Sequence, residues 1–385
     1  MRLVRLAAEG FRNLAPLDLD TSAQFVVFHG QNAQGKTNAL EAIWLLATLR
    51  PLRGHKLADL IGWSQDGVVV RGQVDVRGVR HEHEVRIDPR GRTARVDGDR
   101  VTDLGSYFRS IRAIAFQPSD EAVVSGGPGL RRRWLDRAAF TARPAHLDAV
   151  RQYGRVLQQK QAALRGSAES AVLDVLDTQL ATLGAQVAHR RSVLLDELVP
   201  HVQSLHREIS GGGTALELRY VTAAPGADPA SRARALAQRL AANRAQECRR
   251  RTTVCGVQRD DVALVLGGHA ARTFGSRGQV RSAVLSLKLA ELLAARERGD
   301  HPVFLIDDVS SELDRDRTAR LVSLLAELGT QVFATTTSPE HLGNLPAART
   351  VVVHVEGGRL NTGVESADPA GSSDRKSPVD PSDPT

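Results

Sequence analysis

Residues 30–37 have the composition and spacing of a phosphate-binding loop. They read Gly-Gln-Asn-Ala-Gln-Gly-Lys-Thr. Gly30 and Gly35 allow the backbone to curl until its N–H groups face an anion. Lys36 adds a positive charge for the β- and γ-phosphates, and Thr37 offers a hydroxyl to Mg²⁺. The pattern predicts that ATP and Mg²⁺ bind at the loop and the residue after it: Gly30, Gln31, Asn32, Ala33, Gln34, Gly35, Lys36, Thr37 and Asn38.

The segments on either side of the loop have the order that such a site requires. Residues 25–28 are a short apolar run typical of a buried strand, and residues 38–46 have apolar side chains at helical spacing. Strand, loop and helix therefore follow one another. A glycine-rich turn without function is the alternative, and this order makes it the weaker one.

A second apolar strand, residues 303–306, ends in two acids. Asp307 is placed to hold Mg²⁺ through its waters, and Asp308 to orient or deprotonate the attacking water. With Lys36 these acids form the predicted catalytic set, while Thr37, Gln117 and Asp307 form the predicted metal set. Asp307 lies 271 residues after Lys36, which indicates that a large insertion interrupts the nucleotide-binding fold. A strand ending in a solvated acidic turn is the alternative.

Further polar segments stand in an order that completes a nucleotide site. Gln117 ends a strand over residues 112–116, as a Q-loop glutamine would, and residues 276–279 open a helix, as a signature loop that grips a γ-phosphate would. Residues 310–314 occupy the place of a dimer-contacting D-loop. Each segment alone also fits an ordinary turn. The added nucleotide contacts are Gln117, Ser276, Arg277, Gly278, Gln279, Thr336 at the switch position, and Arg53, which faces either nucleotide or DNA.

The remaining patterns predict an α/β protein of several parts. Alternating apolar residues predict a hairpin over residues 2–20 and an antiparallel meander over 67–101. Helical patterns cover Leu130–Phe140, Ala145–Leu164 and Ser170–Ile209. A further strand is expected at 216–221 and a hairpin over 262–274, followed by helices over 280–298 and 317–328. The predicted division is residues 1–117 and 256–360 for the head, 118–255 for an inserted helical lobe, and 361–385 for a disordered tail.

The charge of the chain favours an acidic partner. The net charge is +7 and the sequence pI is about 10.0, with arginine far commoner than lysine, and arginine forks well onto phosphate. A high-GC coding bias would also enrich arginine, and an arginine cluster is also typical of an ion-paired surface. The candidate DNA contacts are Arg131, Arg132, Arg133, Arg190, Arg191, Arg249, Arg250 and Arg251.

The sequence lacks the pattern of a signal peptide and any apolar run long enough to span a membrane. We therefore expect a cytoplasmic protein without a membrane partner. Two cysteines, Cys248 and Cys255, are too few for a disulfide framework or a zinc site.

Taken together, these motifs resemble the ABC-type ATPase heads of the structural-maintenance-of-chromosomes proteins, and among them the RecF family most. The likeness covers residues 1–360 and combines ordinary ABC motifs with an arginine-rich middle. The insertion is too short for the long coiled coil of the chromosome-maintenance relatives, and Gln258 stands where a histidine is expected. The likeness is carried by residues 10–13, 35–43, 127–128, 131–132, 135–136, 259–261, 276–279 and 307–314.

The resemblance implies an SMC-head-like fold and a weak, DNA-stimulated ATPase of recombinational repair, replication and the SOS response. In such heads ATP is sandwiched between Lys36 of one copy and Ser276 of another, so an ATP-dependent homodimer is expected to close on single-stranded, double-stranded or gapped DNA. Hydrolysis would open it. The resemblance also implies RecO and RecR as partners in placing RecA on DNA.

Two other classes of protein remain open at this point. One is the nucleotide-binding subunit of an ABC transporter, although the usual Leu-Ser-Gly-Gly-Gln signature is absent and the helical insertion is long. The other is a scaffold with degenerate ATPase chemistry, against which the intact Lys36, Thr37, Asp307 and Asp308 argue.

Overall fold

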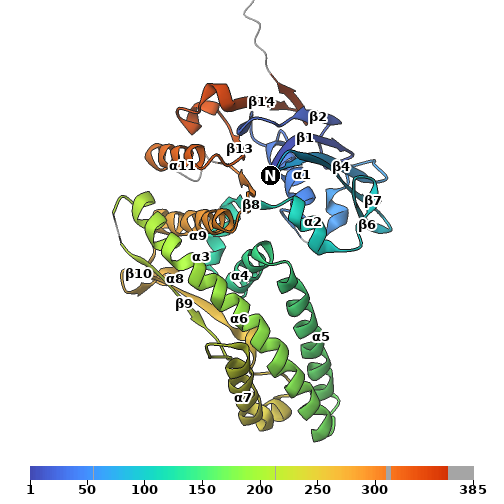
Figure 1. Ribbon diagram of the computed structural model, residues 1–385, viewed down its shortest axis with the longest axis vertical. Coiled ribbons are helices and arrows are strands. Elements are labelled where there is room, and N and C mark those ends of the chain that lie inside the picture. Colours follow the sequence, from blue (N-terminus) through green and yellow to red (C-terminus); the bar gives the residue numbers. More distant parts are fainter. Residues whose placement is uncertain (55, 213, 309–313, 363–385) are drawn as a thin grey trace, which may run out of the picture.

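The computed structural model describes residues 1–54, 56–212, 214–308 and 314–362. Figure 1 shows a head built of β-sheets and flanking helices, from which an elongated, mainly helical lobe extends. In the described ranges, no helix combines the length and apolar character that crossing a bilayer requires.

A mixed six-stranded sheet forms the centre of the head. Its strands over residues 25–29, 113–116, 303–306 and 332–336 are largely apolar and buried on both faces, as parallel strands covered by helices are. Five strands run parallel and the edge strand β15 runs antiparallel to its neighbour. The spatial order is β15 (Arg359–Thr362), β14 (Thr350–Glu356), β3 (Phe25–His29), β13 (Val332–Thr336), β12 (Val303–Ile306) and β8 (Ala113–Phe116).

A second six-stranded sheet is antiparallel and confirms the predicted hairpin and meander. Its strands alternate between buried and partly exposed residues, so one face packs on the head core. Asp97 and Gly98 form a tight turn with φ of 52° and 86°. The order is β2 (Leu17–Asp20), β1 (Arg2–Glu9), β4 (Val68–Val76), β5 (Val79–Asp88), β6 (Gly91–Val96) and β7 (Asp99–Arg100).

Helix α1 (Lys36–Thr48) lies between the two sheets and contacts strands of both. Residues 39–47 of this helix are all buried, which is the pattern of a helix covered on every side. The head is completed by shorter or peripheral elements: η1 (Leu57–Leu60), α2 (Leu104–Ser110), α11 (Arg315–Glu327), η4 (Pro339–Leu342) and η5 (Ala347–Arg349).

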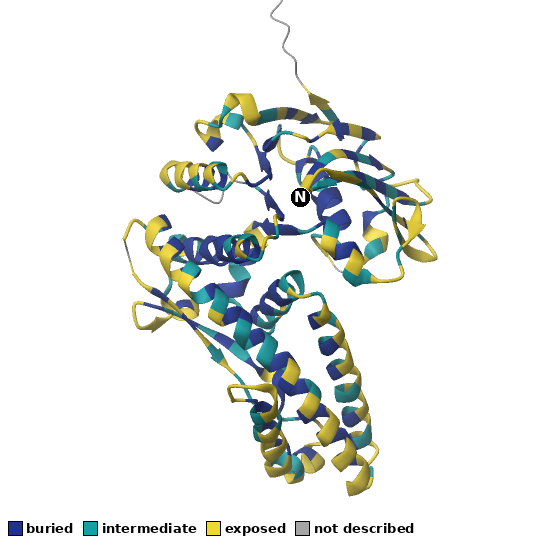
Figure 2. Ribbon diagram, in the orientation of Figure 1, coloured by how far each residue is buried: buried dark blue, intermediate teal, exposed yellow. Residues whose placement is uncertain are grey.

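The lobe confirms the predicted run of helices. The longest helix, α6, packs against α5 and α7, and the buried residues of the three helices face one another (Figure 2). The described elements of this region are η2 (Pro118–Asp120), α3 (Glu121–Ser125), α4 (Pro128–Ala142), α5 (Ala145–Arg165), α6 (Ser170–Ile209) and α7 (Pro229–Arg250).

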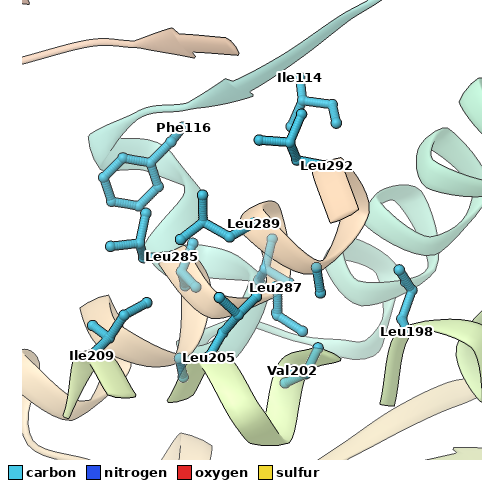
Figure 3. Close-up of a cluster of buried hydrophobic side chains, with 14 of the residues drawn as sticks. Ile114, Phe116, Leu198, Val202, Leu205, Ile209, Leu285, Leu287, Leu289 and Leu292 are labelled. Atoms are coloured by element: carbon cyan, nitrogen blue, oxygen red, sulfur yellow. The ribbon is translucent and has the colours of Figure 1, made fainter. Parts of the chain in front are cut away.

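The C-terminal half of α6 is built into the core of the head. Figure 3 shows Leu198, Val202, Leu205 and Ile209 of α6 beside leucines of α9 (Arg277–Glu297), with Ile114 and Phe116 of β8 above them. The lobe is therefore continuous with the apolar layer under the mixed sheet.

A small third sheet joins segments on both sides of the predicted boundary at residue 255. Its order is β11 (His269–Ala270), β10 (Asp261–Leu266) and β9 (Leu216–Val221), and η3 (Val257–Arg259) precedes β10. The predicted hairpin over 262–274 is wrong in its second half, because residues 271–274 form the short helix α8 (Ala271–Phe274). Four residues are too few for periodicity to separate a strand from one helical turn.

Candidate nucleotide site

Four neighbouring parallel strands bring the predicted motifs to one edge of the mixed sheet. The phosphate loop follows β3, Thr335 lies at the end of β13, Asp307 follows β12 and Gln117 follows β8. Carboxyl ends of parallel strands meet at one sheet edge, which is where open α/β sheets bind ligands. The motifs separated by the insertion are therefore neighbours in space.

The phosphate loop holds its lysine inward. Lys36 is buried, and its Nζ donates hydrogen bonds to the carbonyl oxygens of Gly30 at 2.6 Å and Gln31 at 2.7 Å. Burial lowers the pKa of Lys36, and the nearby Asp308 and Asp307 partly offset this effect. The ammonium is thus poised inside the loop and held there by neutral acceptors.

The metal side of the site joins the two halves of the head sequence. The Oγ1 atoms of Thr37 and Thr335 each donate to Oδ1 of Asp307 at 2.8 Å, and the Asp308 N–H donates to Thr335 Oγ1 at 2.8 Å. Burial raises the pKa of Asp307, although the two hydroxyl hydrogen bonds lower it. A carboxylate and a hydroxyl in contact are oxygen ligands suited to Mg²⁺, whose charge would offset the cost of ionising Asp307.

Sequence reasoning selected Thr336 and missed Thr335. The hydroxyl of Thr336 donates to the carbonyl oxygen of Ser338 at 2.8 Å, whereas that of Thr335 donates to the carboxylate of Asp307, which is predicted to be catalytic. Successive side chains of a strand point to opposite faces. Three consecutive threonines give no signal of which face is which, so only the register of β13 resolves the choice.

The other predicted nucleotide contacts lie around this edge. Nη2 of Arg53 donates to Oδ1 of Asn38 at 2.6 Å and lies 3.6 Å from the buried Glu41. Gln117 is buried, and its N–H donates to Oδ2 of Asp120 at 3.1 Å. The metal role of Gln117 remains a prediction.

The predicted signature loop begins α9. Oγ of Ser276 accepts from the N–H of Gln279 at 3.3 Å, and the Ser276 N–H donates to Oε1 of Gln279 at 2.9 Å, which is a capping box. Ser276 and Arg277 are exposed. In the described part of the chain, no hydrogen bond or ion pair joins residues 276–279 to residues 30–37. Of the predicted D-loop, residues 310–313 lie outside the described residues, and Asp314 caps α11.

Two of the predicted DNA contacts are wrong. Arg131 forks onto the carboxylate of Asp261 at 2.6 and 2.9 Å, and Arg191 forks onto that of Asp136 at 2.7 and 2.8 Å. Their side chains are 8% and 5% exposed. Buried arginines need such partners, so these two stabilise the lobe and have no surface left for DNA.

The other six arginines divide into two groups. Arg132 and Arg190 are partly buried, and each donates to a backbone carbonyl oxygen at 2.6 Å, that of Asp260 and that of Ala145 respectively. The remaining four are exposed, and their contact with DNA stays a prediction: Arg133 on α4, and Arg249, Arg250 and Arg251 at the end of α7.

Comparison with known proteins agrees with this architecture. The family model described as "RecF/RecN/SMC N terminal domain" matches residues 2–359. The "DNA replication and repair protein RecF" of Geobacter metallireducens is 41% identical over 364 residues, which are 94% of this chain and 99% of that protein. The chain belongs to the RecF family. The RecF of Myxococcus xanthus is 37% identical over 377 residues, 96% of this chain and 99% of that protein.

Solved structures of the RecF family share the fold. "Structure of the recombination mediator protein RecF-ATPrS in RecFOR pathway" aligns with a TM-score of 0.85 and 28% identity, covering 94% of this chain and 97% of that one. An Smc head bound to the C-winged helix domain of ScpA aligns at 0.53 with 13% identity, covering 94% and 96%, and shows the fold alone. The predicted fold class is confirmed: the chain is an SMC-head-like member of an ABC-type ATPase family of DNA replication and repair, and an ATP-bound RecF structure supports ATP binding.

Proposed function

We propose that the protein is a cytoplasmic, ATP-dependent DNA clamp of recombinational repair and of replication-fork and gap repair. Two copies would sandwich ATP, and with RecO and RecR the dimer would help to place RecA at single-strand gaps. One observation carries the proposal: the loop of Lys36 and Thr37 meets Asp307 at one sheet edge, while Ser276 is exposed at a separate helix start. We interpret the sheet edge as one half of a nucleotide site.

The geometry supports a division of labour among these residues. Lys36 would exchange its two loop carbonyls for β- and γ-phosphate oxygens, and Thr37 and Asp307 would hold Mg²⁺, which would supply charge neutralisation at the transferred phosphoryl group. Asp308 would orient the attacking water. Loss of the γ-phosphate would remove the contact with Ser276 of the second copy, so hydrolysis would open the dimer and release DNA.

Light scattering tests the sandwich. We expect ATP to convert a monomer into a dimer, and Lys36→Ala or Ser276→Arg to abolish the shift. The first variant removes the phosphate charge, and the second places a bulky cation where Ser276 must approach. An unchanged mass with and without ATP would refute the sandwich.

DNA binding is expected to rest on backbone phosphates, with Arg133 and Arg249–Arg251 as the exposed candidates. If several phosphates are contacted, affinity falls about tenfold or more between low and physiological salt. Fluorescence anisotropy with duplex, single-stranded and gapped DNA measures this fall. An affinity that does not change with salt concentration would argue against DNA as the molecule that the dimer holds.

ATP turnover measured with and without these three DNAs tests the expected weak, DNA-stimulated ATPase. A transporter subunit would give the same rate in all conditions, and a degenerate scaffold would give none.

A further inference from the structure

The phosphate loop has a backbone conformation that its sequence does not stabilise alone. Gly30, Ala33 and Gly35 have φ of 147°, 65° and 113°. Glycine accepts such values freely, but Ala33 carries a Cβ and takes the left-handed conformation at a steric cost. Strain of this kind persists where the surrounding structure over-determines it. The surroundings of the loop should therefore contain whatever holds it in place.

The turn of the last hairpin, between β14 and β15, makes two hydrogen bonds to the loop. The Gly357 N–H donates to Oε1 of Gln34 at 2.7 Å, and the Gly358 N–H donates to the carbonyl oxygen of Gln34 at 3.0 Å. The Gly358 carbonyl in turn accepts from the N–H of Ala15 at 2.9 Å. Gln34 was predicted to contact nucleotide, yet its side-chain amide is directed to this turn.

The loop and the turn each pack against a neighbouring backbone carbonyl too closely for a side chain, the loop against β14 and the turn against the segment before β2. A Cβ added at Gly30 would lie 2.3 Å from the carbonyl oxygen of Val355, and one added at Gly358 would lie 2.0 Å from that of Asn13. A Cβ at Gly357 would have nothing within 4 Å. Of the two turn glycines, only Gly358 is packed against the segment around Asn13, whose Ala15 N–H also donates to the Gly358 carbonyl.

We infer that Gln34 and the turn 357–358 form a brace that holds the phosphate loop in its binding conformation, with Gln34 as a positioning residue. Lys36 holds the loop from the inside through Gly30 and Gln31, but those hydrogen bonds are given up when its ammonium turns to phosphate. Among the described residues, no hydrogen bond joins Lys36 Nζ to Gln34 or to the turn, so the brace is kept when the ammonium moves. Without it the loop relaxes, and nucleotide affinity falls by the fraction of molecules that lose the binding conformation.

Gln34→Met tests the brace because it keeps the length of the side chain and removes the acceptor. We expect the dissociation constants of ATP and ADP, measured by calorimetry, to rise about fivefold to tenfold, as loss of one hydrogen bond to a preorganised loop would give. Gly98→Ala is the matched control. It is matched to the Gly358→Ala variant below, because it adds a Cβ at φ 86°, close to the 79° of Gly358, in a remote hairpin turn with nothing within 4 Å. It should therefore lower the melting temperature and leave both constants unchanged.

The two turn glycines provide an internal comparison. Gly358→Ala should weaken nucleotide binding more than Gly357→Ala, since only the first collides with Asn13. A folded Gln34→Met protein with wild-type affinity, or equal effects of the two glycine variants, would overturn the inference.

The inference rests on ATP binding at this loop and not on dimerisation. ADP affinity reports the brace alone. A wild-type protein that binds ADP but stays monomeric with ATP would refute the proposed clamp and leave the brace intact.

Discussion

Charged side chains are buried both at the sheet edge around Lys36 and Asp307 and at the root of the lobe around Arg191, Asp136 and Asp260. The two regions differ in the groups to which these charges are hydrogen-bonded. At the edge, Lys36 is bonded to neutral carbonyls and Asp307 to neutral hydroxyls. At the root, Arg191 forks onto Asp136 and lies 3.4 Å from Asp260.

The pKa values of Asp307 and Asp136 follow this difference, whereas burial raises the pKa of Asp260, which lies farther from Arg191 and accepts mainly from neutral groups. Burial raises the pKa of Asp307. Burial also acts on Asp136, but hydrogen bonds from His146 and Arg191 outweigh it and lower its pKa to about 2. Opposite charges that form an ion pair neutralise each other, so they attract a charged ligand only weakly. A charge that is hydrogen-bonded only to neutral groups still attracts a ligand of opposite charge. A buried charge is therefore typical of a binding site when its partners are neutral, and of a structural ion pair when its partner carries the opposite charge.

Removing the cation of the ion pair at the root of the lobe should have the largest effect, and this effect should be on the free energy of unfolding alone. Arg191→Met leaves Asp136 and Asp260 buried without their cation, which costs about 3–5 kcal/mol of unfolding free energy. Urea unfolding measures the loss. Arg190→Met, at the adjacent and partly exposed position, should cost under about 1 kcal/mol. If Arg191→Met weakened ADP binding without destabilising the protein, the two regions would not be distinct.

His83 shows the effect of burial on a titratable side chain that is not part of a buried ion pair. Its Nε2 lies 3.0 Å from Ser110 Oγ, and burial, followed by the charge of His81, lowers its pKa to about 4. Because the folded pKa is below the ordinary 6.5, the contribution to stability is full above pH 6.5 and is lost as pH falls toward 4, by about 3 kcal/mol. His83→Gln should flatten this pH dependence in urea titrations, whereas His269→Gln, on an exposed residue, should not.

Asp307→Asn should separate activity from stability. The amide retains an oxygen for Thr37 and Thr335 but loses the metal-side charge, so ATP turnover should fall about 100-fold or more. The folded pKa of Asp307 is raised, so the native state loses stability as pH rises through that pKa, and asparagine removes this loss. We expect unchanged or higher stability at neutral pH. If the variant unfolded more easily than the wild type, the charge of Asp307 would be stabilising the fold, as the charges around Arg191 are expected to do.

The smallest effect is expected inside the loop. Ala33→Gly relieves the left-handed strain at φ 65° and should stabilise the protein by up to about 1 kcal/mol. Differential scanning calorimetry measures the shift, with Ala39→Gly in the middle of α1 as a control that should destabilise.

Much of the fold could be predicted because strong local signals carry it. The phosphate loop, the acidic strand end and the long helices each have a motif or a period of their own, and the structure has them where expected. The third sheet was harder, since β9 and β10 pair across some forty residues of helix and loop.

Side-chain partners were the part that sequence could not supply. Arg131 and Arg133 look alike in the sequence, yet one forks onto Asp261 and the other is exposed. Thr335 and Thr336 differ only in the face of β13 on which they lie. Gln34 reads as part of a ligand motif, and its acceptor Oε1 faces a turn more than three hundred residues away. Such choices depend on tertiary contacts.

Helix α6 gives the molecule a mechanical property. Its 40 residues span about 60 Å at ~1.5 Å per residue. Leu198 and Ile209 lie in the core beside β8, and Leu180 lies in the core of the lobe. Residues 170–193 extend beyond the head core over about 36 Å at ~1.5 Å per residue, so a tilt of about 10° in the head would carry the far end of α6 through roughly 6 Å. A small rearrangement at the sheet edge would thereby become a larger displacement of the basic end of α7, which packs on α6.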